Sequence, residues 1–581
     1  MRAREHESYV SFKELGGPAV TVQQVQSELR NLPLDGVLGC LGRISLAAVQ
    51  AGDKVFDADW QGGYLNAAIA DSFPCTLKQR VPYTSGRHLL IHEHNLAWLA
   101  HQTVMNCRPG TVTPQISPSL SMRVCRLLLI SNDLLTKSSS SVGSDLRERR
   151  AFVLDWLRHH QFNHYFTHPA VTLLSLARQY HILASILPRY FATIENCFAL
   201  ATRGVSLRRY FEILALFSAE ILSGGNRIPW FPRYGLVPAQ DTGLEETVAG
   251  WTRKPTDYRD AANRWSQERP ITPQEGFDLV VLRQSPLIEA RPEEIVCPVF
   301  PLLLAKIQDE PFFMLSDYLA ERQRAQFHEA LGQAYQDYAH SLVGRIAASD
   351  SRGQWSMVPV PPLRDGGELT DSLLVRRNLA VVLEHKGGRP GTAFLTGGGG
   401  HRVLGPSDDL LDKLDGNQPV TPEEGRESDE GILTRGLWQQ TCTSGALSDF
   451  LRQNGYLKPD KVFPLITNMA DIRVDSVARR AYLDPLIERA HLYPDPSWER
   501  PQWVNVTDLE HMAQAAEGRA LDLEALLEEK AKPQYRAEQF DHFLIRFLGG
   551  FRPCKRLLEV GKGLMGTAAK AFFRDLELED E

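Results

Sequence analysis

Three side chains that could do chemistry fall within one short stretch of the sequence: Asp371, Glu384 and Lys386. They lie in two strand-like runs, ELTDSLLV (368–375) and LAVVLEHK (379–386), and the three residues between the runs predict a hairpin. Because side chains alternate between the two faces of a strand, Glu384 and Lys386 should share one face and His385 should point to the other. A tight hairpin would bring Asp371, on the neighbouring strand, beside Glu384.

These residue types suit a hard divalent cation. Such a cation prefers oxygen ligands, commonly one or two carboxylates completed by water and phosphate. Asp371 and Glu384 are therefore candidate ligands for Mg2+ or Mn2+. The metal would lower the pKa of a water molecule and neutralise developing negative charge. Lys386 could orient or deprotonate that water, or stabilise the developing charge, and the sequence leaves these roles open.

The alternative explanation for these charges is a ladder of ion pairs on a surface hairpin. The run Val381, Val382 and Leu383, directly before Glu384, is typical of a strand that is buried on both faces. Charges that emerge from such a strand are costly unless they are paired or functional. The sequence therefore favours a site over a solvated hairpin.

The stretch ELTDSLLVRRNLAVVLEHKGG resembles the D-x(n)-E-x-K core of the PD-(D/E)xK, or restriction-endonuclease-like, superfamily. That family places a helix before the hairpin, with an acidic residue near a G-x-x-F-E-x-Y pattern. The run LGQAYQDYAHSLV (331–343) has this shape, but Gln336 stands in the acid's place and Asp337 follows it. Either Gln336 contributes a neutral oxygen, or Asp337 substitutes for the acid, or the site holds fewer metals.

The resemblance covers about residues 295–530. The family often carries a Gln on a helix after the hairpin, and LTRGLWQQTCTSGALSDFL (433–451) supplies Gln439 and Gln440. A helix surface explains these two glutamines equally well. The strand-like run KVFPLITNM and the segment WVNVTDLEHMAQAAEG also resemble the end of large bacterial nucleases of this kind.

The resemblance implies a metal-dependent nuclease that hydrolyses phosphodiester bonds of nucleic acid, with DNA favoured over RNA. Asp371 and Glu384 would bind Mg2+ or Mn2+, and Lys386 would position or activate the nucleophile. A helical first half joined to such a nuclease also resembles antiphage defence effectors, which implies a homo-oligomer or a partner protein of a defence system. The alternative, favoured by Gln336, is an inactive nuclease fold that binds nucleic acid or acts as a scaffold.

The 581 residues are too many for one core, so several domains are expected. We predict an α+β multidomain protein, in which a mainly α-helical N-terminal region precedes an α/β nuclease domain with a mixed central sheet. Apolar residues at helical spacing predict helices at 119–136, 145–162, 170–200, 206–222 and 318–346, whereas 296–307 and 312–316 read as strand-like. The expected units are a helical region (1–225), an irregular connector with short helices (226–294), the nuclease domain (295–530) with a mobile insertion at about 390–430, and a C-terminal helical extension with an acidic tail (531–581).

Composition excludes some classes of protein. Hydrophobic residues make up 43% and charged residues 23%, which is typical of a globular protein, and the formal net charge is -7. An acidic total does not exclude a nucleic-acid partner, because a metal cleft is acidic and a basic groove can be local. The eight cysteines lack zinc-knuckle spacing, the N-terminus lacks an apolar leader, and no apolar run approaches the length of a membrane span, so we expect a cytoplasmic protein without a membrane partner.

A third hypothesis is a histidine-metal enzyme in the N-terminal half. His88, His92 and His94 cluster around Glu93, and a second group falls at helical spacing, at His160, His164 and His168. Neither group forms H-E-x-x-H. Helix packing is therefore the favoured explanation for both groups.

Overall fold

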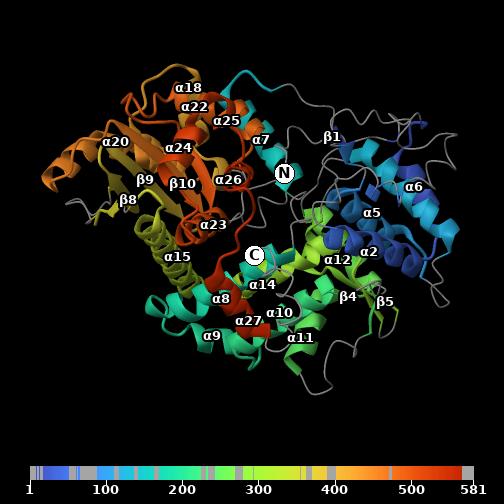
Figure 1. Cartoon of the computed structure of the whole chain (residues 1–581). Helices are drawn as coiled ribbons and strands as arrows, with labels where there is room; N and C mark the ends of the chain where they lie inside the picture. Colours follow the sequence, from blue (N-terminus) through green and yellow to red (C-terminus); the bar gives the residue numbers. More distant parts are fainter. Residues whose placement is uncertain are drawn as a thin grey trace.

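The computed structural model is a mixed α/β protein in which helices predominate, with a helical N-terminal region and a sheet-containing C-terminal part (Figure 1). The structure describes residues 8–9, 12, 17–51, 60–61, 63, 65, 88–89, 91–109, 117–135, 142–161, 169–223, 230–232, 242–268, 279–291, 294–353, 355–360, 369–388, 401–469 and 474–565.

A five-stranded mixed sheet organises the C-terminal part. Its order is β11-β10-β9-β8-β7, with β9, β10 and β11 parallel to one another and β7, β8 and β9 joined antiparallel. The strands are β7 (Ser356–Met357), β8 (Ser372–Arg376), β9 (Leu379–Lys386), β10 (Lys461–Asn468) and β11 (Gln502–Asn505). The predicted hairpin is confirmed, since β8 and β9 pair from Ser372 opposite Leu383 to Arg376 opposite Leu379. The predicted strand at 461–467 is β10.

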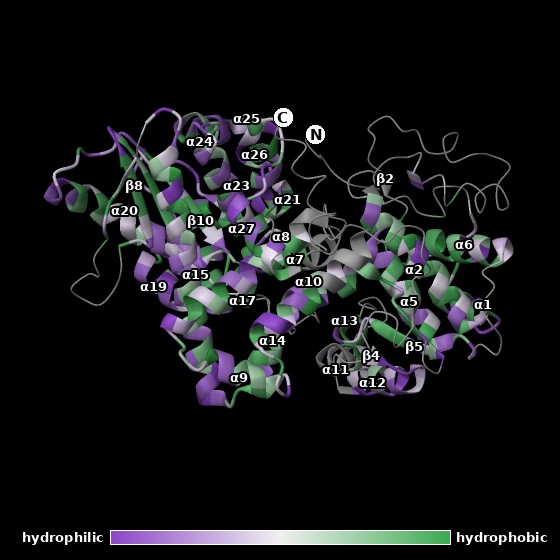
Figure 2. Ribbon diagram, turned by 60° about the horizontal axis from the view of Figure 1, so that its bottom comes forward, coloured by the Kyte–Doolittle hydropathy of each residue, from purple (hydrophilic) through white to green (hydrophobic). Residues whose placement is uncertain are grey.

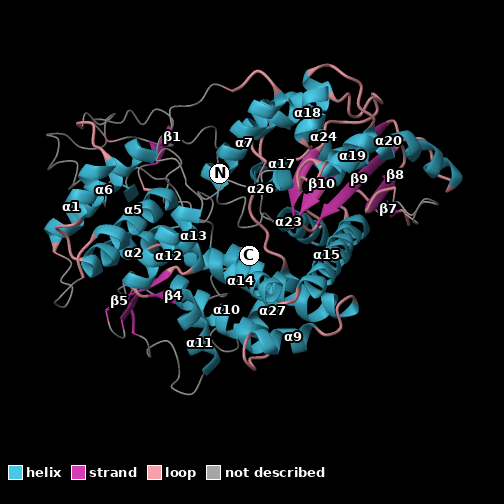
Figure 3. Ribbon diagram, turned by 180° about the vertical axis from the view of Figure 1, so that it is seen from behind, coloured by secondary structure: helices cyan, strands magenta, loops and turns pink. Residues whose placement is uncertain are grey.

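Apolar side chains cover both faces of the sheet, as a central parallel strand requires. On one face Val381, Leu383 and Leu465 join a core with the long helix α15 (Glu321–Ser349) and α23 (Val506–Glu517). The opposite face is covered by α20 (Arg435–Gln453), and Figure 3 shows the strands lying between these helices. Helix α20 approaches β10 closely at Gly436, where an added Cβ would lie 3.0 Å from Ile466. Glycine therefore sets the distance between this helix and the sheet.

The expected insertion at about 390–430 contains three short helices from residue 401 onward. It forms α17 (His401–Leu404), α18 (Asp408–Asp415) and α19 (Pro422–Ser428). Leu410, Leu411 and Leu414 are buried, because three apolar side chains lie on one face of α18. The remainder, 390–400, lies outside the described residues.

Helix α7 (Leu146–Gln161) comes from the N-terminal half of the sequence but packs on the insertion. Its buried residues Val153 and Leu157 share a core with Leu411 and Trp438. At its first turn, the Leu146 amide donates to the Asp415 carboxylate. Further polar contacts join Arg147 to Asp412 and Arg150 to Asp408. Core packing thus joins segments that the sequence assigned to different units, the helical region and the insertion of the sheet domain.

Residues 226–294, expected to be an irregular connector with short helices, also contain a small sheet. Its order is β3-β6-β5-β4, formed by β3 (Trp230–Pro232), β4 (Thr252–Arg253), β5 (Leu287–Arg291) and β6 (Glu294–Val296), with α11 (Thr242–Trp251), α12 (Pro255–Glu268) and α13 (Val280–Gln284) between the strands. These strands are two to five residues long. Such short strands offer too few residues for a period of two to be visible in the sequence.

The segments predicted as strand-like at 296–307 and 312–316 lie largely in the helix α14 (Phe300–Tyr318), so that prediction is wrong. Apolar runs of this length do not distinguish a buried helix from a buried strand. Leu303, Leu304 and Ile307 are all buried at helical spacing. Pro301 is compatible with the helix because proline is tolerated in the first turn.

The helices of the N-terminal half contribute to the extensive apolar core that also includes α15 and α23, and Figure 2 shows how hydrophobic residues alternate with polar ones along them. Besides α7, the described elements of the N-terminal half are β1 (Ser8–Tyr9), α1 (Val22–Leu29), α2 (Leu34–Ala51), β2 (His88–Leu89), α5 (Glu93–Asn106), α6 (Pro118–Leu135), α8 (Pro169–His181), η3 (Ile182–Ile186), η4 (Leu187–Arg189), α9 (Ile194–Ala201) and α10 (Leu207–Ser223). By length and composition α2 could cross a membrane, but 78% of it is buried within the protein.

The C-terminal helices return to the N-terminal half. After α21 (Ser476–Ala478), η5 (Arg479–Leu483), α22 (Asp484–Arg489), α24 (Leu523–Ala531), α25 (Pro533–Arg536) and α26 (Phe540–Leu548), the last described helix is α27 (Lys555–Met565). Helix α27 packs against α8 and α10, as Figure 1 shows. The acidic tail lies outside the described residues.

A buried ion pair joins the two halves. Arg178 on α8 and Glu510 on α23 lie 2.5 Å apart, with side chains only 8% and 3% exposed. The Tyr338 hydroxyl on α15 also donates to Glu510, at 2.7 Å. Removing one partner of a buried pair leaves an uncompensated charge, which is strongly destabilising.

We therefore expect Arg178→Ala to lower the free energy of unfolding by about 3–5 kcal/mol, measured by urea denaturation. Arg208→Ala is the control, because Arg208 pairs with Glu212 at the surface with 68% of its side chain exposed. That control should leave the free energy of unfolding nearly unchanged, because exposed ion pairs contribute little. Equal effects of the two substitutions would contradict the role given to Arg178.

Candidate active site

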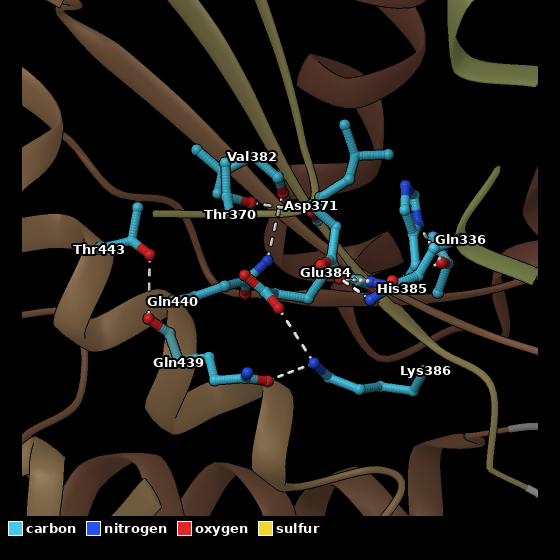
Figure 4. Close-up of polar contacts among 12 residues, drawn as sticks. Gln336, Thr370, Asp371, Val382, Glu384, His385, Lys386, Gln439, Gln440 and Thr443 are labelled. Atoms are coloured by element: carbon cyan, nitrogen blue, oxygen red, sulfur yellow. Dashed lines mark hydrogen bonds and ion pairs between the residues drawn. The ribbon is translucent and has the colours of Figure 1, made fainter. Parts of the chain in front are cut away.

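Glu384 and Lys386 lie on the same face of β9, as predicted from strand alternation. Lys386 Nζ donates to Glu384 Oε2 at 3.0 Å, with the two side chains 15% and 4% exposed. The His385 side chain points to the opposite face, where it contacts Ser372 and Thr467. A carboxylate and an ammonium thus emerge together at the carboxyl end of a central strand (Figure 4).

Asp371 lies directly before the first residue of β8 rather than within the strand. Two N–H groups hold its carboxylate: the Gln336 amide donates to Oδ1 at 3.1 Å, and the backbone amide of His385 donates to Oδ2 at 2.5 Å. The second bond fixes Asp371 against β9, one residue beyond Glu384. The hairpin therefore brings Asp371 close enough to Glu384 for the two carboxylates to repel each other, in agreement with the expected proximity.

Helix α15 brings Gln336 to this site and turns Asp337 away from it. The Tyr190 hydroxyl donates to Asp337 Oδ2 at 2.5 Å, and Arg189 lies 3.6 Å from the same oxygen. Consecutive helical residues point about 100° apart, so one residue on α15 reaches Asp371 and its neighbour does not. Asp337 is thus placed with Tyr190 and Arg189, and not as a substitute for the expected acid.

The two glutamines of α20 have different surroundings. Gln439 Oε1 accepts a hydrogen bond from Lys386 Nζ, so Gln439 belongs to the site. Gln440 is buried, and its amide donates to the backbone oxygens of Val382 and Leu465, at 3.2 and 2.8 Å. Gln440 therefore fastens α20 to the sheet, and Gln439 positions the lysine.

Burial dominates the electrostatics of Glu384, which is 3% exposed. Burial raises its pKa to about 7, and the Asp371 carboxylate raises it too, whereas Lys386 lowers it. Charge is costly in this place because the surroundings are poorly solvated. A cation that shares Glu384 and Asp371 would relieve both effects.

A hydrogen-bonded chain behind the site escaped the sequence analysis. His340 on α15 bonds to Ser372 at 3.0 Å, Ser372 bonds to His385 at 2.9 Å, and His385 bonds to Thr467 on β10 at 2.6 Å. Burial lowers the pKa of His385 to about 4, so its ring is neutral near pH 7. The chain ties α15, β8, β9 and β10 together under Glu384 and Asp371. Polar residues within otherwise apolar strands, Ser372 and Thr467, were the available signal.

The donor set fits a hard cation with few protein ligands. Glu384 is a buried carboxylate beside Asp371, and the amide groups of Gln336 and Gln439 border the pair. Within the described ranges there is no group of three or more His, Cys, Asp or Glu side chains suited to hold a metal. Two carboxylates suit Mg2+ or Mn2+, which keep water and substrate oxygens as their remaining ligands.

Among the histidines of the N-terminal half, His92 has a structural role. His92 is the N-cap of α5, where its ring accepts from the Asn95 amide and bonds to Asn132 at 3.0 Å. Burial lowers its pKa to about 3. The side chains of His88, His160, His164 and His168 lie outside the described part of the chain.

Comparisons with known proteins gave no match: neither a protein-family model, nor a curated protein, nor a solved structure is significantly similar to this chain.

Because the pKa of Glu384 is raised, we expect this carboxyl to lower the stability of the folded protein at high pH. A carboxyl whose pKa is higher in the folded than in the unfolded protein loses stabilisation as the pH rises through the folded value, here about 7. Without added metal, Glu384→Gln should therefore raise the melting temperature above pH about 8 and leave it nearly unchanged below pH about 5. Differential scanning fluorimetry measures both. Glu559→Gln, which removes an exposed carboxylate, should have no effect at either pH. A Glu384→Gln protein less stable than wild type at the higher pH would contradict the prediction.

Proposed function

We propose that this protein is a divalent-metal-dependent nuclease with a restriction-endonuclease-like core around the five-stranded sheet. The observation that carries the proposal is the convergence of Asp371, Glu384 and Lys386 at the adjoining ends of β8 and β9. Buried charges that gather in this way are expensive, and they are typical of functional sites.

Each side chain has a role that follows from its contacts. Asp371 and Glu384 would hold Mg2+ or Mn2+, which when bound activates water and neutralises charge on the phosphate. Lys386 donates to Glu384 and to Gln439, which aims its ammonium along the metal-binding face. From there it would orient the attacking water and stabilise the negative charge that develops on phosphate oxygens. Gln336 and the His385 amide keep Asp371 in place.

The surroundings of Gln336 favour a site for a single metal. Gln336 contributes an N–H donor to Asp371, and Asp337 is engaged by Tyr190 and Arg189. Two carboxylates are then the charged ligands, which suits one hexacoordinate cation better than two. Of the alternatives raised by the sequence, a site with fewer metals agrees best with this arrangement.

The proposed substrate is nucleic acid, with DNA favoured over RNA because of the family that the sequence resembles. We also propose that the protein acts as an effector of antiviral defence. Arg178 on α8 and Glu510 on α23 link the helical half to the part that contains the sheet. A conformational change caused by a trigger that binds the helices would be transmitted to the site through these packed elements.

A second candidate function is an inactive nuclease fold that binds nucleic acid or serves as a scaffold. The specific observation in its favour is that Gln336 replaces an acid and is itself satisfied by Asp371. The two functions differ in whether the carboxylates and Lys386 matter for cleavage.

We expect wild-type protein to cleave plasmid DNA or RNA with Mg2+ or Mn2+, and to be inactive in EDTA. Glu384→Ala should abolish cleavage, and Lys386→Ala should lower it by about 10²–10⁴-fold, as for the loss of a positioned proton donor or acceptor. Lys532→Ala is the control, because Lys532 is half exposed and pairs with Glu529 on the surface. Wild type and both site variants behaving identically across substrates would support the inactive fold.

The neighbouring residues Gln336 and Asp337 provide a matched pair of variants. Gln336→Ala should raise the Mg2+ concentration for half-maximal cleavage by about 10–100-fold, because residues that orient metal ligands typically contribute this much. Asp337→Ala should leave the Mg2+ dependence unchanged, since Asp337 faces Tyr190. The opposite order would mean that Asp337 is the missing acid.

A further inference from the structure

Asn468 is the last residue of β10, and it lies beside the proposed active site. It is in register with Lys386 on β9 and with Asn505 on β11. Paired residues of parallel strands share a face, and the strands lie about 4.8 Å apart. The Asn468 side chain therefore stands on the same face as Glu384 and Lys386, one strand further along the sheet.

The Asn468 amide is buried and unsatisfied. It is 0% exposed, and among the residues that the structure describes neither its Oδ1 nor its Nδ2 has a hydrogen-bond partner. Folded proteins rarely leave a buried amide unpaired, because the lost hydrogen bonds to water are not replaced. The residues paired with Asn468 on the neighbouring strands are engaged: Lys386 bonds to Glu384 and Gln439, and Asn505 caps α23.

The backbone around Asn468 is held firmly. Its strand pairs with β9 and β11 up to this residue, and the amide of Met469 donates to Lys386 O at 3.0 Å. Ligands of open α/β sheets bind beyond the carboxyl ends of parallel strands, which is where Lys386, Asn468 and Asn505 lie. A free amide at that edge points to a ligand rather than to a packing role.

We propose that Asn468 is a further substrate-binding residue, whose Nδ2–H donates to a phosphate oxygen of the nucleic-acid backbone beside the phosphate attacked at Lys386. This inference rests on the proposed nuclease function. Asparagine and lysine side chains are common donors to phosphate oxygens, and such contacts set the register of the strand without reading its sequence. A phosphate is favoured here because the residue paired with Asn468 on β9 is Lys386, whose positive charge attracts an anion.

The test separates substrate binding from folding. Leucine matches the shape of asparagine and removes the unsatisfied amide, so Asn468→Leu should keep or raise the melting temperature. Binding of a fluorescently labelled DNA oligonucleotide, and of RNA of the same sequence, is measured by anisotropy with Ca2+ in place of Mg2+. We expect Asn468→Leu to weaken this binding by about tenfold, as for one lost hydrogen bond to a charged oxygen. Cleavage with Mg2+ should fall by at least as much.

Asn454→Leu is the control, because Asn454 is exposed at the far end of α20 and donates to Phe450 O. If Asn468→Leu binds and cleaves like wild type while Glu384→Ala is inactive, the proposal for Asn468 is overturned and the nuclease proposal stands. If wild type and Glu384→Ala cleave alike, the nuclease proposal fails, and the binding measurement alone decides on Asn468. A variant that does not fold is replaced by Asn468→Ser, for which the same weakened binding is expected.

Discussion

The alternation of side chains along β9 is the constraint on which the rest of the site depends. Glu384 and Lys386 emerge on one face and His385 on the other, so a single strand serves two layers at once. The backbone amide between them, that of His385, binds Asp371 and sets the second carboxylate beside the first. A slip of one residue in the pairing of β8 and β9 would send the charges into the apolar layer under α15. The apolar residues on both faces of the sheet therefore fix the register of β8 and β9, and with it the positions of the charged side chains.

Both layers around the sheet contribute polar groups to this point. From one side α15 supplies Gln336 to Asp371, and from the other α20 supplies Gln439 to Lys386. Each helix is fixed by a second contact: the His340–Ser372 bond anchors α15, and Gln440 anchors α20 to two strand carbonyls. Charged groups held on rigid elements by such supporting contacts are pre-organised, which is what metal binding and transition-state stabilisation require.

The packing between the halves makes the sheet part of a larger body. Helix α7 completes the core over the insertion helices, and α27 returns from the end of the described chain to pack on α8 and α10. The Arg178–Glu510 pair lies between α8 and α23, and α23 packs along α15. The helical half is thus connected to Gln336 on α15 through α8 and α23, which are packed in series.

The sequence by itself determined the strongly periodic and the short-range features. The hairpin, the shared face of Glu384 and Lys386, the strand at β10 and the long helix α15 follow from apolar spacing and from two-residue alternation, which act locally. Tertiary structure decided the rest. Apolar runs such as α14 are ambiguous until packing selects helix or strand, and the choice between Gln336 and Asp337 depends on how α15 is rotated against the sheet. The placement of α7 and the hydrogen bonds from His340 to Thr467 join residues far apart in sequence, and the burial of the unpaired Asn468 amide likewise results from packing around β10. Only the folded chain brings such residues together, because their contacts arise from three-dimensional packing and leave no local pattern.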